Sequence, residues 1–325
     1  MAYEEISKVH EELGKLIEEG FKVGQKQTQE FASQNSISVE DLVGGKVDPM
    51  MLIKFYRHLS DSSGILNNEE IPGDVTIERI NIGELPAEWI YVPGAFEHKI
   101  YLTLFGGGYI MGNLESRRWI PYLLSKVTNY RCLNVGYRLA PEHPFPAALD
   151  DSISAYQWLL AKDIDPNNII IGGESAGGGL TMATLLKLKE LKLPLPKAAV
   201  MMSPWVDLTG SGKSLETNYK YEPVLAEGVK QMGIVYAGGK STKNPLISPV
   251  FADLGGLPSL LIQVGGIEAI LDDSILLAER AKSAGVQVTL EVYENMNHVF
   301  QEFGDLLSES KKAFDNIKKF IDSLP

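Results

Sequence analysis

The sequence predicts an α/β protein built on a mostly parallel sheet, with helices on both faces of that sheet. Two observations support this prediction. Strand patterns alternate with helical patterns through the second half of the chain, and most of these strands are apolar almost throughout. Such strands have to be buried on both faces, as in a parallel sheet between two helical layers. The chain of 325 residues is long enough for one large α/β domain with insertions.

The beginning of the chain has helical patterning and no strand pattern. Apolar residues recur at helical spacing from Ile6 to Ile17 among Glu and Lys residues, which predicts one amphipathic first helix. Further along, Asp48 followed by Pro49 is typical of an N-cap with proline in the first turn, so a helix is predicted over residues 50–59. Because these helices precede every strand, we expect them to lie over structure formed later in the chain.

Short segments rich in β-branched and aromatic residues are predicted to be strands, and they indicate a sheet of about eight strands. They cover residues 75–80, 88–92, 100–105, 132–135, 169–171, 198–202, 260–264 and 286–293. Helices are predicted near residues 147–160, 176–191, 273–284 and 306–321. Between residues 202 and 260 no strand pattern occurs. A segment that long between two strands is usually a lid or another functional insertion.

Composition argues against several classes of function. The formal net charge of −12 disfavours a nucleic-acid partner, which would need a basic stripe or patch. No run approaches the ~20 apolar residues of a membrane span. No His or Cys cluster accompanies a carboxylate at the spacing of metal ligands, so neither a metal nor a cofactor is expected.

Cysteine usage and the N-terminal residues indicate the compartment. The single cysteine, Cys132, cannot form an internal disulfide, although secreted proteins of this size often carry disulfides. The chain begins with charged residues and has no apolar core of signal-peptide length. A reducing compartment is favoured, and a cytoplasmic location is expected.

A Gly-x-Ser-x-Gly motif, residues 173–177, places Ser175 between an apolar strand and a helix. The motif is common by chance, but the strand–turn–helix context is the one that a nucleophilic serine requires. The N-terminus of the following helix would also favour negative charge near the serine oxygen. The alternative is a Gly-rich structural turn or a phosphate-binding loop, and the lysine of the latter is missing. Ser175 is therefore the candidate nucleophile.

A serine nucleophile needs a base that is oriented by a third group. Of five histidines, only His298 follows a late strand in a loop, at the carboxyl edge of the predicted sheet where such folds bind ligands. Glu268 follows the preceding strand at the same edge and is the favoured acid. Asp272 and Asp273 lie one turn later and remain alternatives, although either would suit the N-cap of the next helix.

A charged reaction intermediate needs backbone N–H donors. Residues 106–108 are three glycines at the end of the third predicted strand, where the chain can turn its amides into a site without side-chain clashes. Ala176 supplies the N–H next to the candidate nucleophile. A tight loop with no catalytic part is the alternative interpretation of the glycines.

Four segments together resemble a known family. They are Gly106-Gly107-Gly108-Tyr109, residues 137–148 (YRLAPEHPFPAA), residues 173–178 (GESAGG) and residues 203–208 (SPWVDL). Through them the chain resembles the hormone-sensitive-lipase-like (family IV) microbial carboxylesterases, which have the α/β-hydrolase fold. The resemblance extends from about residue 100 to residue 300.

The resemblance implies roles for single residues. It makes Ser175 the nucleophile and His298 the base, and it makes Gly107, Gly108 and Ala176 the oxyanion donors. Tyr109, Trp205 and Tyr219 would be pocket walls, although each could equally be a packing residue of the core or cap.

The resemblance also implies a division of the chain into domains. Residues 1–60 and 204–240 would form a cap over a catalytic domain of residues 61–203 and 241–325. The implied partner is a small-molecule ester. Similar enzymes commonly form homodimers, which the sequence itself does not show.

Three positions depart from the family pattern. Phe105 stands where a histidine usually precedes the glycines, and we expect packing to anchor this loop instead of a hydrogen bond. Glu268 replaces the usual aspartate of the triad, and Glu174 replaces the usual aspartate before the serine. These changes bear on rate and pH profile more than on the class of reaction.

The leading functional hypothesis is hydrolysis of short- to medium-chain carboxylic esters through an acyl-enzyme. The same triad acting on a lactone, amide or carbamate is a second hypothesis, which the sequence does not separate from the first. A third is a degenerate hydrolase that binds a small molecule without turning it over.

Overall fold

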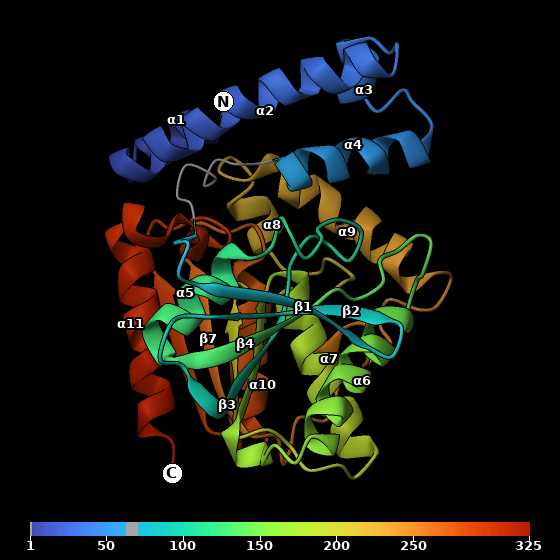
Figure 1. The fold of residues 1–325 in the computed structure, drawn as a ribbon. Coiled ribbons are helices and arrows are strands. Elements are labelled where there is room, and N and C mark those ends of the chain that lie inside the picture. The colour runs from blue at the N-terminus through green and yellow to red at the C-terminus, as the bar shows by residue number, and fades with distance from the viewer. Residues whose placement is uncertain (1, 63–70) are drawn as a thin grey trace.

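The computed structural model describes residues 2–62 and 71–325. Met1 and residues 63–70, the latter at the start of the predicted catalytic domain, lie outside the described residues. Figure 1 shows two stacked parts: helices α1–α4 above, and below them a twisted sheet surrounded by helices. The helices are α1 (Ala2–Ser7), α2 (Glu11–Gln34), α3 (Val39–Val43), α4 (Pro49–Ser62), α5 (Trp119–Thr128), α6 (Ala147–Ala161), α7 (Ala176–Glu190), α8 (Ser214–Thr217), α9 (Pro223–Ala237), α10 (Leu271–Ser283) and α11 (Ser308–Ser323), with 3₁₀ helices η1 (Pro166–Asn168), η2 (Pro249–Phe251) and η3 (Phe300–Leu306).

The described residues contain an eight-stranded sheet in the order β1-β2-β4-β3-β5-β6-β7-β8. Its strands are β1 (Thr76–Ile82), β2 (Leu85–Tyr91), β3 (Phe96–Leu104), β4 (Tyr130–Val135), β5 (Ile169–Glu174), β6 (Ala198–Met202), β7 (Ser259–Gly265) and β8 (Val288–Tyr293). Strand β2 pairs antiparallel with β1 and β4, and the other neighbouring pairs are parallel. The predicted mostly parallel sheet of about eight strands is confirmed.

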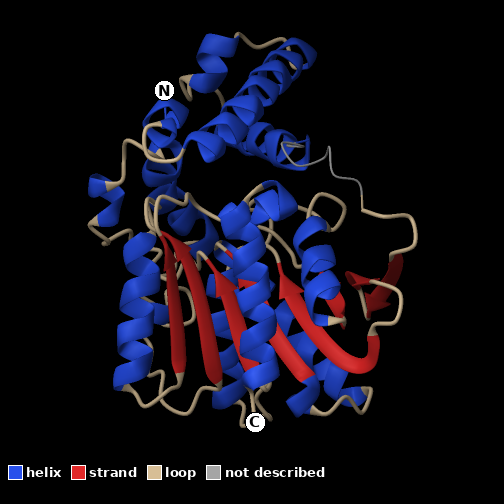
Figure 2. Ribbon diagram, turned by 90° about the vertical axis from the view of Figure 1, so that its left-hand side faces the viewer, coloured by secondary structure: helices blue, strands red, loops and turns tan. Residues whose placement is uncertain are grey.

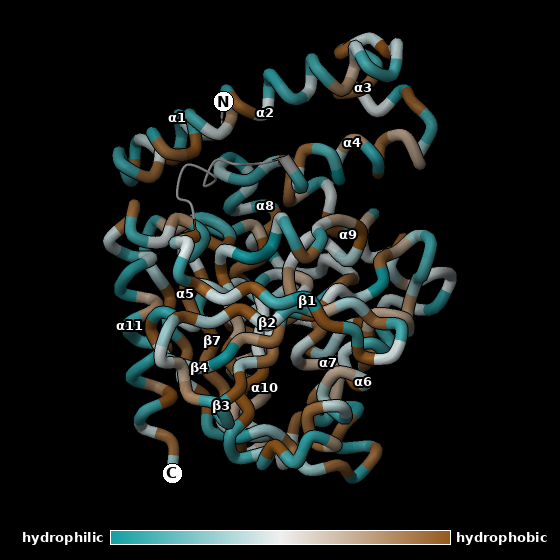
Figure 3. Tube along the Cα trace, in the orientation of Figure 1, coloured by the Kyte–Doolittle hydropathy of each residue, from teal (hydrophilic) through white to brown (hydrophobic). Residues whose placement is uncertain are grey.

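Helices cover both faces of the sheet because its central strands are apolar on both sides. In β5, Ile169 and Ile171 belong to one apolar cluster and Ile170 to another, as expected where successive side chains point to opposite faces. The first cluster includes residues of α6, α7 and α10, and the second includes residues of α5 and α11. Figure 3 shows hydrophobic residues gathered in the middle of the molecule.

The N-terminal helices lie at the carboxyl edge of the parallel strands. The arrowheads of these strands point toward them in Figure 2. Ile6 of α1 and Leu13 of α2 are buried in one cluster with Met296 and Phe300, which follow β8. The same edge carries the loops in which the candidate catalytic residues lie, so the first helices pack directly on that region.

Arg57 fixes α4 to the sheet domain. Its guanidinium donates two hydrogen bonds to the Glu142 carboxylate, at 2.8 and 2.7 Å. It also donates to the carbonyl oxygens of Ile110 and Ala140, at 2.7 and 3.0 Å. The hydrogen bond from Arg57 lowers the pKa of Glu142 to about 2, so the Glu142 carboxylate is ionised at neutral pH.

The start of the chain differs from the prediction of one helix through Ile17. Helix α1 ends at Ser7 and α2 begins at Glu11. His10 between them is extended, and its Nδ1 accepts a hydrogen bond from the Leu13 N–H at 3.1 Å, which caps α2. The apolar spacing continues across the break because α1 and α2 contribute to the same cluster.

The start of α4 agrees with the prediction. Asp48 caps the helix through a hydrogen bond from the Met50 N–H to its Oδ1, at 2.9 Å.

Four α-helices of the described residues, α3, α5, α8 and α9, were not predicted from the sequence. Helix α5 has ten residues, seven of them buried, and so short an apolar segment does not by itself distinguish a helix from a strand. Helices α8 and α9 lie between β6 and β7, in the segment predicted to lack strands. Within residues 2–62 and 71–325, no helix has both the length and the apolar character needed to cross a membrane.

Candidate active site

Ser175 lies in a sharp turn between β5 and α7, with φ 54° and ψ −120°. This is a strained conformation for a residue with a side chain, and it is typical of a nucleophilic serine at a strand–helix turn. A Cβ on Gly173 or Gly177 would lie 2.0 or 1.9 Å from the carbonyl oxygen of Leu104 in β3. Glycine is therefore required on both sides of Ser175, which explains the motif found in the sequence.

The structure brings Ser175, His298 and Glu268 together from three loops at the carboxyl edge of the sheet. His298 Nε2 lies 2.8 Å from Ser175 Oγ, and His298 Nδ1 lies 2.9 Å from Glu268 Oε2. These are hydrogen-bond distances. The sequence separations of 123 and 30 residues show that the order of the sheet strands, not local sequence, creates the arrangement.

Glu268 is fully buried in the acid loop, defined here as residues 265–270. Its Oε1 accepts hydrogen bonds from the Ser203 hydroxyl at 2.6 Å and from the Gly265 N–H at 2.5 Å. This leaves Oε2 for His298. Ser203 Oγ also accepts a hydrogen bond from the Val299 N–H at 3.0 Å, so one serine links both loops. The sequence analysis included Ser203 in a family motif but gave it no role.

Three carboxylates influence the charge on His298, which lies in the histidine loop, defined here as residues 294–299. Burial alone lowers the pKa of His298, but the hydrogen bond and charge of Glu268 and the charges of Glu222 and Glu302 raise it more. The net result is a pKa above the usual range for histidine. The site therefore favours the imidazolium form of His298.

The alternative acids are engaged elsewhere. Asp272 Oδ2 accepts a hydrogen bond from the Ser214 N–H at 3.1 Å. Asp273 Oδ2 accepts from the N–H groups of Val206 and Asp207, at 2.8 and 2.7 Å. Both aspartates hold the segment after β6, whereas Glu268 is hydrogen-bonded to His298.

The glycine loop, defined here as residues 105–109, passes beside Ser175. Gly107 and Gly108 have φ values of 122° and 61°, which a residue with a side chain adopts only with strain. Ala176 is the first residue of α7. Among the residues that the structure describes, the N–H groups of Gly107, Gly108 and Ala176 have no hydrogen-bond acceptor within the chain, so they are free to bind an anion.

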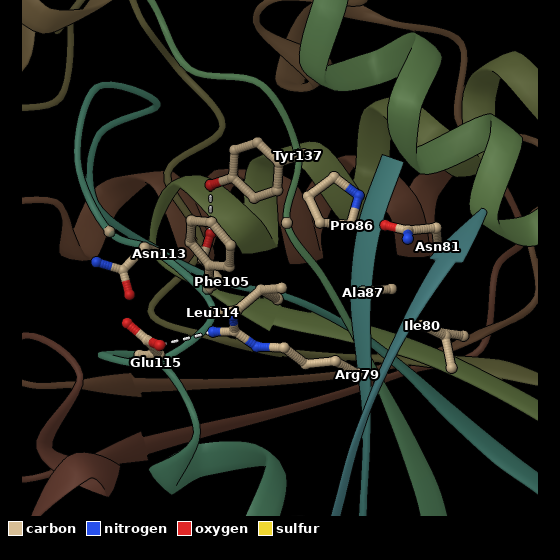
Figure 4. A pocket seen from close by; sticks show the side chains of 12 residues that line it. Arg79, Ile80, Asn81, Pro86, Ala87, Phe105, Asn113, Leu114, Glu115 and Tyr137 are labelled. Carbon is tan, nitrogen blue, oxygen red and sulfur yellow. Dashed lines mark hydrogen bonds and ion pairs between the residues drawn. The ribbon is translucent and has the colours of Figure 1, made fainter. Parts of the chain in front are cut away.

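Phe105 is held by both packing and a hydrogen bond. Its ring stacks on Tyr137 with centroids 4.3 Å apart, and the Tyr137 hydroxyl donates to the Phe105 carbonyl oxygen at 2.6 Å (Figure 4). We expected packing alone to anchor this loop, and the hydrogen bond was not anticipated. The two rings border a cavity of about 420 Å³ on the β1–β2 side of the loop, with Arg79 and Glu115 among its other lining residues.

Glu174 provides a second anchor for the glycine loop. Its buried carboxylate accepts a hydrogen bond from the Gly106 N–H at 2.6 Å. Burial raises the pKa of Glu174 to about 7, although the Gly106 N–H opposes this shift. The sequence marked Glu174 as a departure from the family pattern but gave no indication of this partner.

The three suggested pocket residues occupy different environments. Tyr109 is buried, and its ring stacks on Tyr236 of α9 with centroids 3.7 Å apart. Trp205 is buried beside Tyr109, with ring centroids 6.0 Å apart. Tyr219 is 44% exposed and donates a hydrogen bond to Glu227. Tyr109 and Trp205 therefore pack together, whereas Tyr219 lies at the surface.

Comparisons with known proteins agree with this geometry. The model of the family described as alpha/beta hydrolase fold matches residues 101–302. An acetyl-hydrolase from Streptomyces hygroscopicus is 36% identical over 85% of this chain and 90% of its own length. An esterase from Acinetobacter venetianus is 38% identical over 77% of this chain and 83% of its own length.

A solved structure described as an esterase from the bacterial hormone-sensitive lipase family is 40% identical. It covers 92% of this chain and 98% of its own chain, with a TM-score of 0.81. The chain therefore belongs to the alpha/beta hydrolase fold family and, within it, to the hormone-sensitive-lipase-like esterases.

Proposed function

We propose that this carboxylic ester hydrolase cleaves short- to medium-chain esters through an acyl-enzyme formed on Ser175, with His298 as general base and Glu268 as the acid that orients it. The observation that carries the proposal is the continuous chain of hydrogen bonds from Ser175 Oγ through the His298 ring to Glu268. A serine hydroxyl is a poor nucleophile alone, and this arrangement supplies the base and the group that fixes its tautomer.

The reaction proceeds in two halves. Ser175 Oγ attacks the ester carbonyl carbon while its proton passes to His298 Nε2. The imidazolium then donates that proton to the departing alkoxide, which leaves as an alcohol. Water attacks the acyl-enzyme in the same way, with His298 again taking and returning the proton, and the carboxylic acid is released.

The N–H groups of Gly107, Gly108 and Ala176 are proposed to stabilise the oxyanion in both halves. Their lack of acceptors within the described chain supports this role, as does the position of Ala176 at the positive end of α7. Glycine at the first two positions lets the backbone turn toward the serine.

A cap of residues 1–60 and 204–240 is proposed over a catalytic domain of residues 61–203 and 241–325. The burial of Ile6 and Leu13 against the region after β8 supports this division. The division is also supported by Tyr236 of α9, in the second cap segment, whose ring stacks on Tyr109 of the glycine loop. In this arrangement the cap excludes water from an apolar acyl group.

The acyl chain length is inferred from one contact and one relative. A Cβ on Gly108 would lie 2.5 Å from Met232 Sδ, so Met232 of α9 rests directly on the glycine loop and limits the space there. A relative of similar length is named an acetyl-hydrolase. Both support a preference for short acyl groups over long ones.

The proposal is tested by labelling and kinetics. A p-nitrophenyl alkylphosphonate should label wild-type Ser175 stoichiometrically, and mass spectrometry of peptides locates the label. Ser175→Ala should not be labelled and should lose nearly all activity on p-nitrophenyl acetate. Retention of most of that activity by Ser175→Ala would disprove the mechanism.

A substrate panel of matched esters, lactones, amides and carbamates distinguishes the bond that is cleaved. If a lactone, amide or carbamate is turned over faster than the matched ester, that class becomes the proposed substrate, and the proposed triad is unaffected. A folded wild-type protein that is not labelled would instead support a binding role.

A further inference from the structure

Glu222 is a partly buried carboxylate that reaches both catalytic loops from outside them. It immediately precedes α9, in the segment between β6 and β7. One carboxylate oxygen, Oε2, accepts a hydrogen bond from the Ala269 N–H in the acid loop at 2.7 Å. The other, Oε1, accepts a hydrogen bond from the N–H of His298 itself. A single side chain thus links the acid loop to the histidine loop.

Asn218 completes the contact with the acid loop. Its Nδ2 donates to the carbonyl oxygen of Glu268 at 2.8 Å. The carbonyl of Glu268 and the N–H of Ala269 belong to the same peptide group. Asn218 and Glu222 therefore clamp that peptide group from both sides, immediately after the acid of the triad.

We propose that Glu222 is a positioning residue of the catalytic centre, which fixes the spacing of the acid and histidine loops and keeps a negative charge beside the imidazolium of His298. The inference rests on the proposed function, because it assumes that Glu268 and His298 act together. It adds that the segment before α9 helps to determine the geometry of the triad.

The charges around His298 define what this carboxylate contributes. Glu268 faces the imidazole from the acid loop, Glu222 from the segment before α9, and Glu302 from η3. Glu302 is also paired with Arg117, whose Nη1 lies 3.4 Å from its Oε1. Burial raises the pKa of Glu222, whereas the positive charge of His298 and the N–H groups of Ala269 and His298 lower it. Charge on Glu222 and charge on His298 are therefore mutually favourable.

Loss of the charge should shift the pH profile in a definite direction. Glu222 is one of the groups that raise the pKa of His298, so removing it lowers that pKa. Catalysis needs the neutral imidazole in the free enzyme. The acidic limb of kcat/KM should therefore move to lower pH in Glu222→Gln. The rate on the plateau should fall roughly tenfold to a hundredfold, because at least one loop contact is lost.

Two further variants separate charge from position. Glu222→Asp keeps the charge on a shorter side chain. Its plateau value of kcat/KM should fall, whereas its acidic limb should stay closer to that of wild type than the limb of Glu222→Gln does. Asn218→Ala removes the other half of the clamp without changing any charge, so it should lose rate with the acidic limb unmoved. Glu227→Gln is the matched control, since it removes one exposed negative charge from the same segment and should resemble wild type.

The experiment measures kcat/KM for p-nitrophenyl acetate, and the rate of phosphonate labelling, across pH for all five proteins. Labelling isolates the first chemical step from product release. An acidic limb in Glu222→Gln that coincides with wild type would overturn the inference. If Glu222→Gln does not fold, Glu222→Asp provides the test instead. An acidic limb of kcat/KM in Glu222→Asp that moves clearly to lower pH, although the negative charge is kept, would then overturn the inference. Failure of wild-type Ser175 to be labelled would show that the proposed function itself is wrong.

Discussion

The carboxylate of Glu174 accepts a hydrogen bond from the backbone N–H of Gly106 at 2.6 Å, so the residue before the candidate nucleophile holds the start of the glycine loop. Because Ser175 is the next residue, this contact sets the distance between the serine and the proposed oxyanion donors. Together with the hydrogen bond from the Tyr137 hydroxyl to the Phe105 carbonyl oxygen, it anchors the first two residues of that loop.

Replacing Glu174 by Ala should lower kcat while changing KM little. The Gly106 N–H would lose its buried acceptor, and the donors would move relative to the oxyanion rather than to the bound ester. We expect a loss of roughly tenfold to a hundredfold in kcat for p-nitrophenyl acetate. Glu174→Gln keeps an acceptor oxygen and should lose less. A kcat for Glu174→Ala equal to wild type would show that Phe105 and Tyr137 hold the loop without it.

The two carboxylates considered for the triad should respond very differently to substitution. Glu268→Ala should lower kcat by roughly a thousand- to ten-thousandfold, because His298 would lose the group that fixes its tautomer and stabilises its charge. Asp272→Ala should remain close to wild type in kcat, since Asp272 bonds to Ser214 rather than to the histidine. Steady-state kinetics on both variants decide the assignment, and a collapse confined to Asp272→Ala would reverse it.

Asp273 should make folding stability depend on pH. Burial raises its pKa to about 8 from an ordinary value of 3.8, although two backbone N–H groups oppose the shift. Between these values the folded chain holds a proton that the unfolded chain releases. The stability of the wild type relative to Asp273→Asn should therefore fall as pH rises from about 4 to about 8.

Urea unfolding of wild type and Asp273→Asn across this range measures the effect. Taking the difference between the two proteins removes the contribution of every other titrating group that they share. A difference that does not change with pH would mean that the N–H groups of Val206 and Asp207 keep Asp273 ionised throughout.

The candidate site residues that could be predicted from the sequence lie at strand ends. Ser175, Glu268 and His298 each follow a recognisable strand, and parallel strands bring their carboxyl ends to one edge. At these positions the strand pattern of the sequence and a residue type suited to catalysis therefore occur together. The same reasoning explains why the parallel part of the sheet could be predicted with its strands in nearly the observed places.

Glu222 and Met232 could not be found in this way. Both lie in the segment between β6 and β7, which has no strand to fix its path. Their partners are 47 to 124 residues away along the chain, and only the folded course of α9 brings them close. Helix α5 was missed for another reason: its ten residues form a short, mostly buried apolar segment, which does not by itself distinguish a helix from a strand.

Met232 offers a test of what limits the acyl group. Its sulfur lies where a side chain on Gly108 would be, so it occupies space directly beside the proposed oxyanion donors. Removing the side chain in Met232→Ala should open that space to additional methylene groups. One methylene in an apolar pocket changes specificity by roughly tenfold or more when it fits.

The ratio of kcat/KM for p-nitrophenyl hexanoate to that for p-nitrophenyl acetate should therefore rise by about tenfold or more in Met232→Ala. Met232→Leu nearly conserves volume and should leave the ratio close to wild type, which controls for a general disturbance of α9. If both variants lose activity on the two esters equally, Met232 supports the glycine loop rather than limiting chain length. An unchanged ratio with full activity would place the acyl chain elsewhere, and the contact between Met232 and Gly108 would then be one of packing alone.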